Sequence, residues 1–352
     1  MFPESSGGPL EIRRSASVPP DRLDAARILR EETESEGFVR FGVAVAGEPP
    51  GQARFRDWIA AGRHAGMGYL ARTAAVRGRP QDLLPGARSV VCLAAPHSPR
   101  PLVAQDGSRI ARYAAGPDYH GTLRERADRS ARRAALRLGL QFRYRVCVDS
   151  TPLAERSLAA AAGLGWIGKN GCLIDPEHGS FLLLAEILTD LDLPADEPIA
   201  ELCGSCSRCL EACPTNAFIE PGLLDSARCL SYWTIEHRGR LPDPVKEGLG
   251  DHVFGCDACQ EACPWNAPLA PPDPQPPPTR AEWVEMGPGQ WRRRFGATAL
   301  NRAGRRGLAR NAAASSGACG DRPLLPVLQR AAGVHEAGLS DAARWAAARL
   351  LG

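Results

Sequence analysis

The sequence predicts an α+β multidomain protein, with an α/β layer domain, a cysteine-rich domain and a helical domain in that order. Three observations lead to this prediction. Patterns typical of strands and of helices interleave up to about residue 195. Eight of the twelve cysteines fall between residues 203 and 263, and the pattern after residue 308 is that of short helices alone.

The first 195 residues hold the strands and helices of the α/β domain. Residues 142–148 alternate apolar and mostly polar side chains, which predicts a half-buried strand. Residues 89–95 are almost wholly apolar, as in a buried strand. Thr151 and Pro152 resemble the cap and first turn of a helix. The remaining expected segments are helices at 21–36, 54–61 and 121–139, a strand at 38–46 and an apolar segment at 180–188.

The domain boundaries follow from changes in composition. The stretch from residue 264 to 279 holds eight prolines and predicts a stiff linker. The last helices resemble a single HEAT-type repeat, which cannot bury its own apolar face and should dock on the rest of the protein. The expected segments are a disordered extension (1–18), the α/β domain (19–195), the cysteine-rich domain (196–265), the linker (266–290) and the Arg-rich HEAT-like helices (291–352).

Composition excludes several classes of protein. The net charge is only +3, and no apolar run approaches the roughly 20 residues that span a bilayer, so no membrane contact is expected. Clustered cysteines indicate metal ligation in a reducing compartment, and we expect a cytoplasmic protein. Arg13 and Arg14 are not followed by the apolar segment of an export signal. The cysteines outside the cluster region are expected to be small buried apolar residues: Cys92, Cys147, Cys172 and Cys319.

The cysteine spacing indicates two iron–sulfur clusters. The run that begins at Cys203 reads C-x2-C-x2-C-x3-C-P, the bacterial-ferredoxin pattern for a [4Fe–4S] cluster. The run that begins at Cys256 lacks a first cysteine, which Cys229 can supply. Zinc and disulfides are the alternatives, but zinc needs neither a third cysteine at the same short step nor the Cys-Pro ending. In two-cluster ferredoxins the last cysteine of each run crosses to the other cluster. Carried over, the sets are Cys203, Cys206, Cys209 and Cys263, and Cys213, Cys229, Cys256 and Cys259.

Asp149 is the candidate acid of the α/β domain. It follows a predicted strand, where α/β sheets place ligands. A buried carboxyl there would have a raised pKa and could hold a proton at neutral pH. A turn or capping role ahead of Thr151 is the alternative. Gly163, Gly165 and Gly168 allow close backbone approach, but this G-x-G-x-x-G follows a helix and is weak evidence for a dinucleotide.

Seven arginines and no acidic residue lie between Trp291 and Asn311. Arginine offers a forked donor to phosphates, so this run favours contact with a polyanion. A solvated helix face remains the alternative. The candidate contacts are Arg302, Arg305, Arg306 and Arg310.

Several motifs together resemble the epoxyqueuosine reductase family, over residues 20–350. They are VDSTPLAE from Val148, AGLGWIGKN from Ala162, RYAAGPDYH from Arg112, and the two cysteine runs CGSCSRCLEACPTNA and GCDACQEACPWN. One departure is Ala111, where some members of the family carry cysteine.

The resemblance implies a cobalamin- and iron–sulfur-dependent oxidoreductase that acts on tRNA. Its members convert epoxyqueuosine at the wobble position to queuosine, the last step of queuosine biosynthesis. By position, the proton donor of the family falls on Asp149. The implied cobalamin contacts are Arg77, Asn170 and the backbone near Leu173, together with Tyr119, His120 and Lys169.

The inventory of residues fits a two-electron, two-proton reduction that is fed by an external donor of the ferredoxin or flavodoxin class. The sequence has no Asp-x-His-x-x-Gly pattern, so we expect base-off cobalamin. We also expect a monomer. Two other activities are compatible with the cysteines: a corrinoid iron–sulfur reductive dehalogenase, and a non-catalytic ferredoxin-type electron-transfer module.

Overall fold

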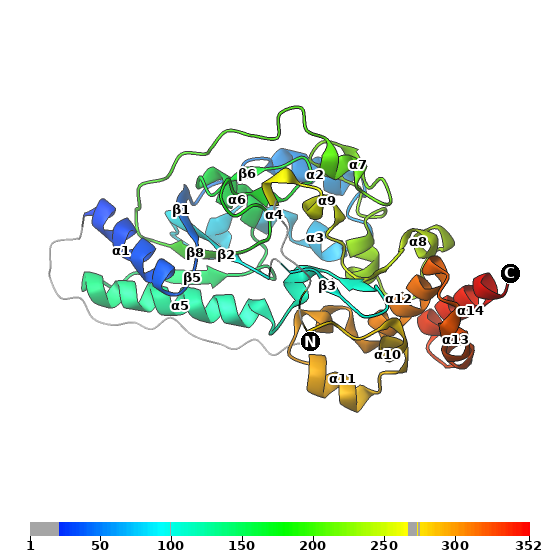
Figure 1. The fold of residues 1–352 in the computed structure, drawn as a ribbon. Helices are drawn as coiled ribbons and strands as arrows, with labels where there is room; N and C mark the ends of the chain where they lie inside the picture. Colours follow the sequence, from blue (N-terminus) through cyan, green and yellow to red (C-terminus); the bar gives the residue numbers. More distant parts are fainter. Residues whose placement is uncertain (1–20, 99, 267–272, 274) are drawn as a thin grey trace.

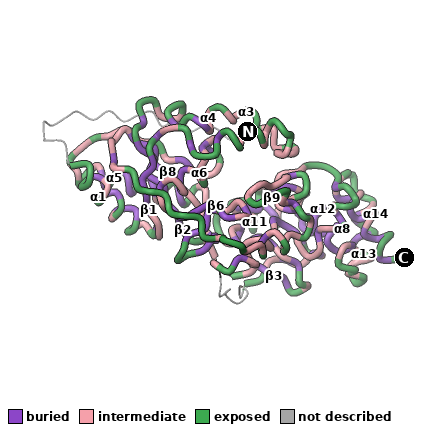
Figure 2. The backbone as a smooth tube through the Cα atoms, turned by 90° about the horizontal axis from the view of Figure 1, so that it is seen from above, coloured by how far each residue is buried: buried purple, intermediate pink, exposed green. Residues whose placement is uncertain are grey.

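The structure, a computed structural model, describes residues 21–98, 100–266, 273 and 275–352 (Figure 1). The predicted extension 1–18 lies outside the described residues, as does part of the proline-rich linker. In two views the C-terminal helices lie at the opposite end of the molecule from the first helix (Figures 1 and 2).

The first part of the chain folds around one four-stranded sheet, with the order β1-β2-β8-β5. All three strand pairs in this sheet are antiparallel, whereas an α/β layer domain usually has a parallel sheet. The α+β class itself holds. The elements are α1 (Arg22–Ser35), β1 (Arg40–Val45), α2 (Gln52–Ala60), α3 (Gly68–Arg72), α4 (Ala74–Arg77), η1 (Pro80–Asp82), β2 (Ser89–Pro96), β3 (Leu102–Val103), β4 (Arg109–Ile110), η2 (Arg112–Ala114), α5 (Tyr119–Leu138), β5 (Tyr144–Cys147), α6 (Glu155–Ala161), β6 (Trp166–Ile167), β7 (Leu173–Ile174) and β8 (Leu182–Thr189).

Each face of this sheet buries a separate apolar core. Helices α1 and α5 cover one face, and α6 covers the other (Figure 1). The alternation of β8 divides its side chains between the two cores. Ala185 and Ile187 face α1 and α5, whereas Leu188 faces α6. This second core therefore lies directly beneath the segment that carries Asp149.

The helix predicted to begin at Thr151 and Pro152 begins later. Helix α6 starts at Glu155, and its N-cap residue Ala154 provides no side-chain cap. The intervening residues instead form a loop whose Leu153 packs in the core beneath the sheet.

The cysteine-rich part consists of short elements joined by loops. They are α7 (Arg208–Glu211), β9 (Phe218–Glu220), β10 (Leu223–Leu224), η3 (Tyr232–Glu236), α8 (Asp243–Gly248), β11 (His252–Phe254), α9 (Ala258–Glu261) and η4 (Pro264–Asn266). Strand β11 pairs in parallel with β4 of the N-terminal part, and β4 pairs with β3. The two parts therefore share a small three-stranded sheet.

The C-terminal part is helical and docks on the rest of the chain. Its elements are α10 (Arg280–Glu285), α11 (Pro288–Phe295), η5 (Ala299–Arg302), α12 (Gly304–Cys319), η6 (Arg322–Leu324), α13 (Leu325–Ala332) and α14 (Ala337–Leu351). Helix α10 falls within the predicted linker and buries Trp283, so that range is partly structured. Helix α12 packs against α14 on one side and against α8, β11 and η3 on the other. The predicted docking of this layer is therefore observed.

Two of the four remaining cysteines clearly follow the expectation of burial. Cys92 and Cys147 are fully buried in the core beneath α6. Cys172 is intermediate, and Cys319 is exposed at the end of α12, so the expectation is wrong for Cys319. None of the helices in the described ranges is long and apolar enough to cross a membrane.

Candidate functional site

Asp149 lies two residues beyond β5, at the edge of the main sheet. Its φ is +45°, in the left-handed region that residues other than glycine rarely adopt. Such strain persists only where the surroundings hold it, and it clusters at functional sites. Here the backbone N–H of Asp149 donates to the side chain of Glu155 at the start of α6.

Three donors converge on one oxygen of Asp149. The hydroxyl of Tyr119 and Nε2 of His120 each lie 2.7 Å from Oδ2, and Nη2 of Arg302 lies at 3.1 Å. Burial by itself raises the pKa of Asp149, but the hydrogen bond from His120, the charge of Arg302 and the hydrogen bond from Tyr119 together lower it to about 2. The expected raised pKa is therefore wrong, because the sequence did not reveal these donors. Asp149 is ionised at neutral pH, and its side chain remains 39% exposed.

The pKa of His120 is raised, which favours its protonated form. Its Nδ1 lies 2.6 Å from Asp118 Oδ1, while its Nε2 faces Asp149. Burial lowers the pKa of His120, but hydrogen bonds to Asp149 and Asp118 outweigh burial and raise it. Arg302 Nη2 also lies 3.2 Å from the same Nε2. The imidazole thus lies between two carboxylates, with a guanidinium beside it.

Arg302 belongs to this site. Arg302 comes from the C-terminal helical layer. Its side chain bridges Asp149, at 3.1 Å, and Glu236, at 3.3 Å. The contact of this arginine with RNA stays a prediction. The arginine-rich pattern marked its importance, but only the fold shows that it turns inward.

A second layer of acids lies beneath Asp149. Burial, followed by the charge of Asp149, raises the pKa of Glu155 to about 8. Glu186 of β8 is fully buried between Cys92 and Cys147, its cross-strand neighbours. Within the described residues, neither of its carboxyl oxygens has a hydrogen-bond partner. Burial and the nearby Glu155 raise its pKa well above the ordinary value, so it is a neutral acid at pH 7.

Neither glutamate was among the predicted site residues. Glu155 ends the VDSTPLAE motif, and Glu186 is the one charged residue of SFLLLAEIL. An acid in an otherwise apolar strand was the available signal, since such residues are rarely buried unless they are neutral or paired.

The expected cobalamin contacts fall into two groups. Tyr119 and His120 contact Asp149 directly. Arg77, at the end of α4, donates to the carbonyl of Leu153 at 3.0 Å and lies within electrostatic reach of Asp149.

The second group lies near the β6–β7 hairpin. Lys169 Nζ donates to the carbonyls of Gly204 (2.6 Å) and Cys206 (3.0 Å), so it holds the first cysteine loop. The buried Asn170 reaches the carbonyl of Cys259 at 3.4 Å. Leu173 is buried in the core beneath α6. These side chains therefore join the main sheet to the cysteine-rich part.

The eight clustered cysteines lie in two groups. Cys209 is within electrostatic reach of Cys203, Cys206 and Cys263, although Cys263 belongs to the second run. Cys263 packs with Trp166, whose indole Nε1 lies 3.4 Å from Cys203 Sγ.

The second group gathers around Cys256, which is within electrostatic reach of Cys229 and Cys213. Cys259 in turn is within reach of Cys256 and Cys229. A zinc site draws its sulfurs to about 2.3 Å from one point. In the part of the chain that the structure describes, no three His, Cys, Asp or Glu side chains are arranged to hold a single metal ion.

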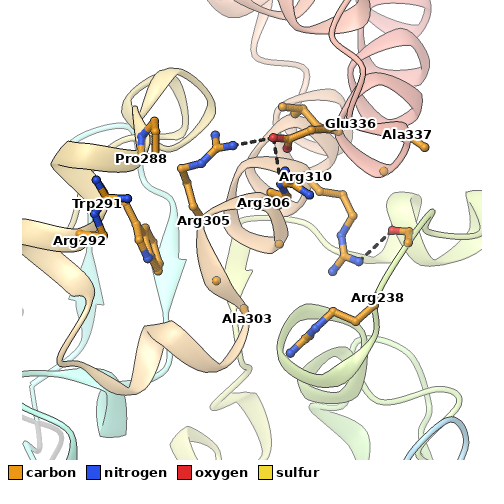
Figure 3. Close-up of a pocket in the computed structure, with 15 residues that line it drawn as sticks. Arg238, Pro288, Trp291, Arg292, Ala303, Arg305, Arg306, Arg310, Glu336 and Ala337 are labelled. Atoms are coloured by element: carbon orange, nitrogen blue, oxygen red, sulfur yellow. Dashed lines mark hydrogen bonds and ion pairs between the residues drawn. The ribbon is translucent and has the colours of Figure 1, made fainter. Parts of the chain in front are cut away.

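The other predicted RNA contacts lie around a cavity at the starts of α12 and α14 (Figure 3). Arg305 and Arg306 both point at Glu336, with nitrogens 2.5 Å and 3.1 Å from its Oε1. Arg310 is only 3% exposed, and it donates to Asn311 and to the carbonyls of Trp233, His237 and Gly239. These groups hold its guanidinium inside the fold at the wall of the cavity, and its contact with RNA stays a prediction.

Comparisons with known proteins agree with this arrangement. The family model described as Epoxyqueuosine reductase QueG matches residues 77–150, and a model described as a 4Fe-4S double cluster binding domain matches residues 202–266. Epoxyqueuosine reductase of Xanthomonas campestris is 41% identical over 242 residues, which are 67% of this chain and 68% of that protein. Epoxyqueuosine reductase of Gloeobacter violaceus is 39% identical over 312 residues, which are 83% of this chain and 96% of that protein.

Solved structures agree as well. A crystal structure of epoxyqueuosine reductase with a tRNA-Tyr epoxyqueuosine-modified stem loop has a TM-score of 0.84 at 29% identity, over 94% of this chain and 91% of that chain. Epoxyqueuosine reductase from Streptococcus thermophilus also gives a TM-score of 0.84, at 26% identity, over 94% of this chain and 90% of that chain. The chain therefore belongs to the epoxyqueuosine reductase family and carries a [4Fe–4S] double-cluster domain.

Proposed function

We propose that this chain reduces the epoxide of epoxyqueuosine, at the wobble position of a tRNA anticodon, to give queuosine. The observation that carries the proposal is the Asp149 site, inside a chain of this family that also holds eight clustered cysteines. A relative was crystallised with an epoxyqueuosine-modified tRNA stem loop, which supports RNA as the substrate.

The overall reaction consumes two electrons and two protons. Both C–O bonds of the epoxide break, a carbon–carbon double bond forms, and the oxygen leaves as water. We assign the cysteines to two [4Fe–4S] clusters: Cys203, Cys206, Cys209 and Cys263 for one, and Cys213, Cys229, Cys256 and Cys259 for the other. The clusters receive single electrons from an external donor of the ferredoxin or flavodoxin class.

Cobalamin is the second cofactor of the proposal, and it supplies a low-valent cobalt centre for the reduction. Such a group would lie beside Asp149, whose side chain is partly exposed. Arg77, Tyr119, His120, Lys169, Asn170 and the backbone near Leu173 are the residues we assign to it.

His120 also supports base-off binding of cobalamin. Both ring nitrogens of His120 face carboxylates, so the imidazole next to Asp149 has no free lone pair for cobalt.

The protein groups at Asp149 deliver one of the two protons, and solvent supplies the second. His120 holds one proton as the imidazolium, and Asp149 passes it to the epoxide oxygen as the ring opens. Arg302 and Tyr119 orient the carboxylate during this transfer. Asp149 thus remains the proton donor to substrate, with His120 as the store.

Other parts of the proposal concern location and assembly. Twelve cysteines without a disulfide in the described residues are typical of a reducing compartment, which supports a cytoplasmic location. We propose that the protein acts as a monomer. The QueG-type match at 77–150 lies outside the cysteine-rich part, which weighs against a pure electron-transfer module, and the family weighs against a reductive dehalogenase.

Anaerobic turnover tests the proposal. The purified protein, loaded with clusters and cobalamin, is incubated with a chemical reductant and an RNA stem–loop that contains epoxyqueuosine. Nucleoside mass spectrometry should show conversion to queuosine. Full cofactor loading with unchanged epoxyqueuosine would overturn the proposal.

A further inference from the structure

A cavity of about 590 Å³ opens at the C-terminal helical layer, between helix α11 and the first turns of α12 and α14 (Figure 3). Its size is typical of small-molecule sites. Five arginines line it, against one acidic residue, Glu336. The arginines are Arg238, Arg292, Arg305, Arg306 and Arg310.

The lining has an uncompensated positive charge. Arg305 and Arg306 share the single carboxylate of Glu336. The side chain of Arg292 has no ion-pair or hydrogen-bond partner among the described residues. Burial and the nearby charge of Arg238 lower the pKa of Arg310 to about 10. These arginines therefore favour an anion in the cavity.

Two helix starts add to this preference. Helices α12 and α14 have 16 and 15 residues, and neither has a side-chain cap at its N-terminus. The first turns of both helices line the cavity. Their unpaired N–H groups and the positive ends of their dipoles point where a phosphate would be stabilised.

The rest of the wall is apolar. Pro288, Trp291 and Leu339 line the cavity beside the arginines, and Trp291 is only 7% exposed. A free inorganic anion would leave this wall unused. A phosphate that carries a sugar and a flat base would contact both kinds of surface.

The cavity wall is connected to the catalytic acid. Arg238 donates to the backbone carbonyl of Arg302, and Ala303, the next residue, lines the cavity. The side chain of Arg302 reaches Asp149 at 3.1 Å. A ligand that fixes this wall therefore fixes the arginine that orients Asp149.

We propose that the cavity binds one nucleotide of the substrate RNA, near the modified one, and that its occupation positions Arg302 on Asp149. This rests on the proposed function, since it takes the modified RNA as substrate. The phosphate lies between the arginines and the two helix starts, and the base or sugar lies against Trp291.

A matched pair of variants on α11 tests the binding part. Arg292→Ala removes a cavity arginine, and Arg293→Ala removes an equally charged, exposed neighbour that does not line the cavity. We expect Arg292→Ala to weaken binding of an unmodified anticodon stem–loop about tenfold, and Arg293→Ala about twofold at most. The slope of log K against log salt concentration should become shallower by about one, the value of one phosphate contact, for Arg292→Ala alone. Equal effects would mean general attraction and would overturn the site.

A second pair leaves the charge unchanged. Ala337→Trp fills the cavity from the exposed first turn of α14, and Ala348→Trp adds the same bulk at an exposed position near the end of that helix. Only Ala337→Trp should weaken RNA binding and lower kcat on modified RNA. Adenosine monophosphate and inorganic phosphate serve as competitors. If they bind wild type but not Ala337→Trp, while RNA binding is the same in both, the cavity serves a free nucleotide or phosphate and our assignment is wrong.

The two proposals fail in different ways. If wild-type protein does not reduce the modified RNA, the proposed function fails, whatever the binding pairs show. If wild type turns over and Arg292→Ala and Ala337→Trp match their controls, only the nucleotide site fails.

Discussion

Three hydrogen-bond donors converge on Oδ2 of Asp149, and each favours the ionised carboxylate. The same contacts raise the pKa of His120, so we place the proton of this cluster on His120. A carboxylate and an imidazolium in contact can pass a proton to the substrate and be reprotonated between turnovers. Proton transfer at this site therefore depends on both Asp149 and His120.

Asp149→Asn tests the carboxylate. Asparagine keeps the size of the side chain but cannot pass a proton, and general acid catalysis contributes about 10²–10⁴-fold. We expect turnover to fall by about that factor while iron and cobalamin contents stay at wild-type levels. Turnover within about tenfold of wild type would remove Asp149 from the proton path.

Asp118→Asn tests whether His120 stores the proton. Asp118 caps α5 and also contacts His120 Nδ1. Asparagine caps a helix equally well, so the fold should be kept. With one carboxylate lost, and Arg302 still close, the pKa of His120 should fall. The alkaline limb of the pH–kcat profile should therefore move to lower pH. An unmoved limb would show that His120 is not the titrating group.

Glu186→Gln tests the buried acid beneath the site. Its pKa in the folded protein is raised, so the stability that the neutral form contributes is complete below the unfolded pKa, near 4.5, and is lost as pH rises. The glutamine variant should match wild type near pH 4 and become more stable than wild type toward pH 8, by at most about 1.4 kcal/mol per pH unit. Thermal unfolding measures this, with the exposed Glu177→Gln as control. A pH-independent difference would contradict the neutral state.

The sequence predicted part of this site. Asp149 could be predicted because it follows a predicted strand and belongs to the VDSTPLAE motif. The place of Arg302 beside Asp149 was not predicted, since a run of seven arginines does not show which one turns inward. Glu186 was missed, since its burial depends on strands β2 and β5, which are distant in sequence.

At the scale of elements, local patterns predicted the long segments well. The strand expected at 89–95 is β2, and the helix expected at 121–139 is α5, with ends shifted by one or two residues. Strand direction was not predicted, because it depends on connections between distant segments. The two-residue strands β3, β4, β6, β7 and β10 carry too few residues to show a period.

Gly317 shows what the packing of α12 on α14 requires. A Cβ at Gly317 would lie 2.7 Å from Ala346 Cα in α14. Gly317→Ala should therefore lower the unfolding temperature, although alanine is the better helix former. The control is Gly289→Ala in α11, where a Cβ would meet only the flexible side chain of Arg293, at 3.6 Å. Equal midpoints for the two variants would contradict this contact.

For the whole molecule, the two cysteine runs are interleaved rather than sequential. Cys263 lies with the first run and also packs on Trp166 and Ile174 of the N-terminal part. The spacing of the cysteines suggested this crossing. It could not show that Cys263 would also help to join two parts of the chain.

Cys263→Ser tests the crossing. Under our assignment, this variant loses the cluster of the first set, so iron content should fall by about half. Cys203, Cys206 and Cys209 should become open to alkylation, while Cys213, Cys229 and Cys256 stay protected. Cys319→Ser, at an exposed cysteine, should change neither result. Alkylation of Cys256 instead would show an uncrossed arrangement.

The bridge from Arg302 to Asp149 has a consequence for when the site forms during synthesis on the ribosome. The two residues are 153 positions apart, and the N-terminal part emerges and folds first. Until the segment around Arg302 is made and docks, Asp149 lacks its guanidinium partner. A nascent chain could thus acquire iron before its reaction centre is complete.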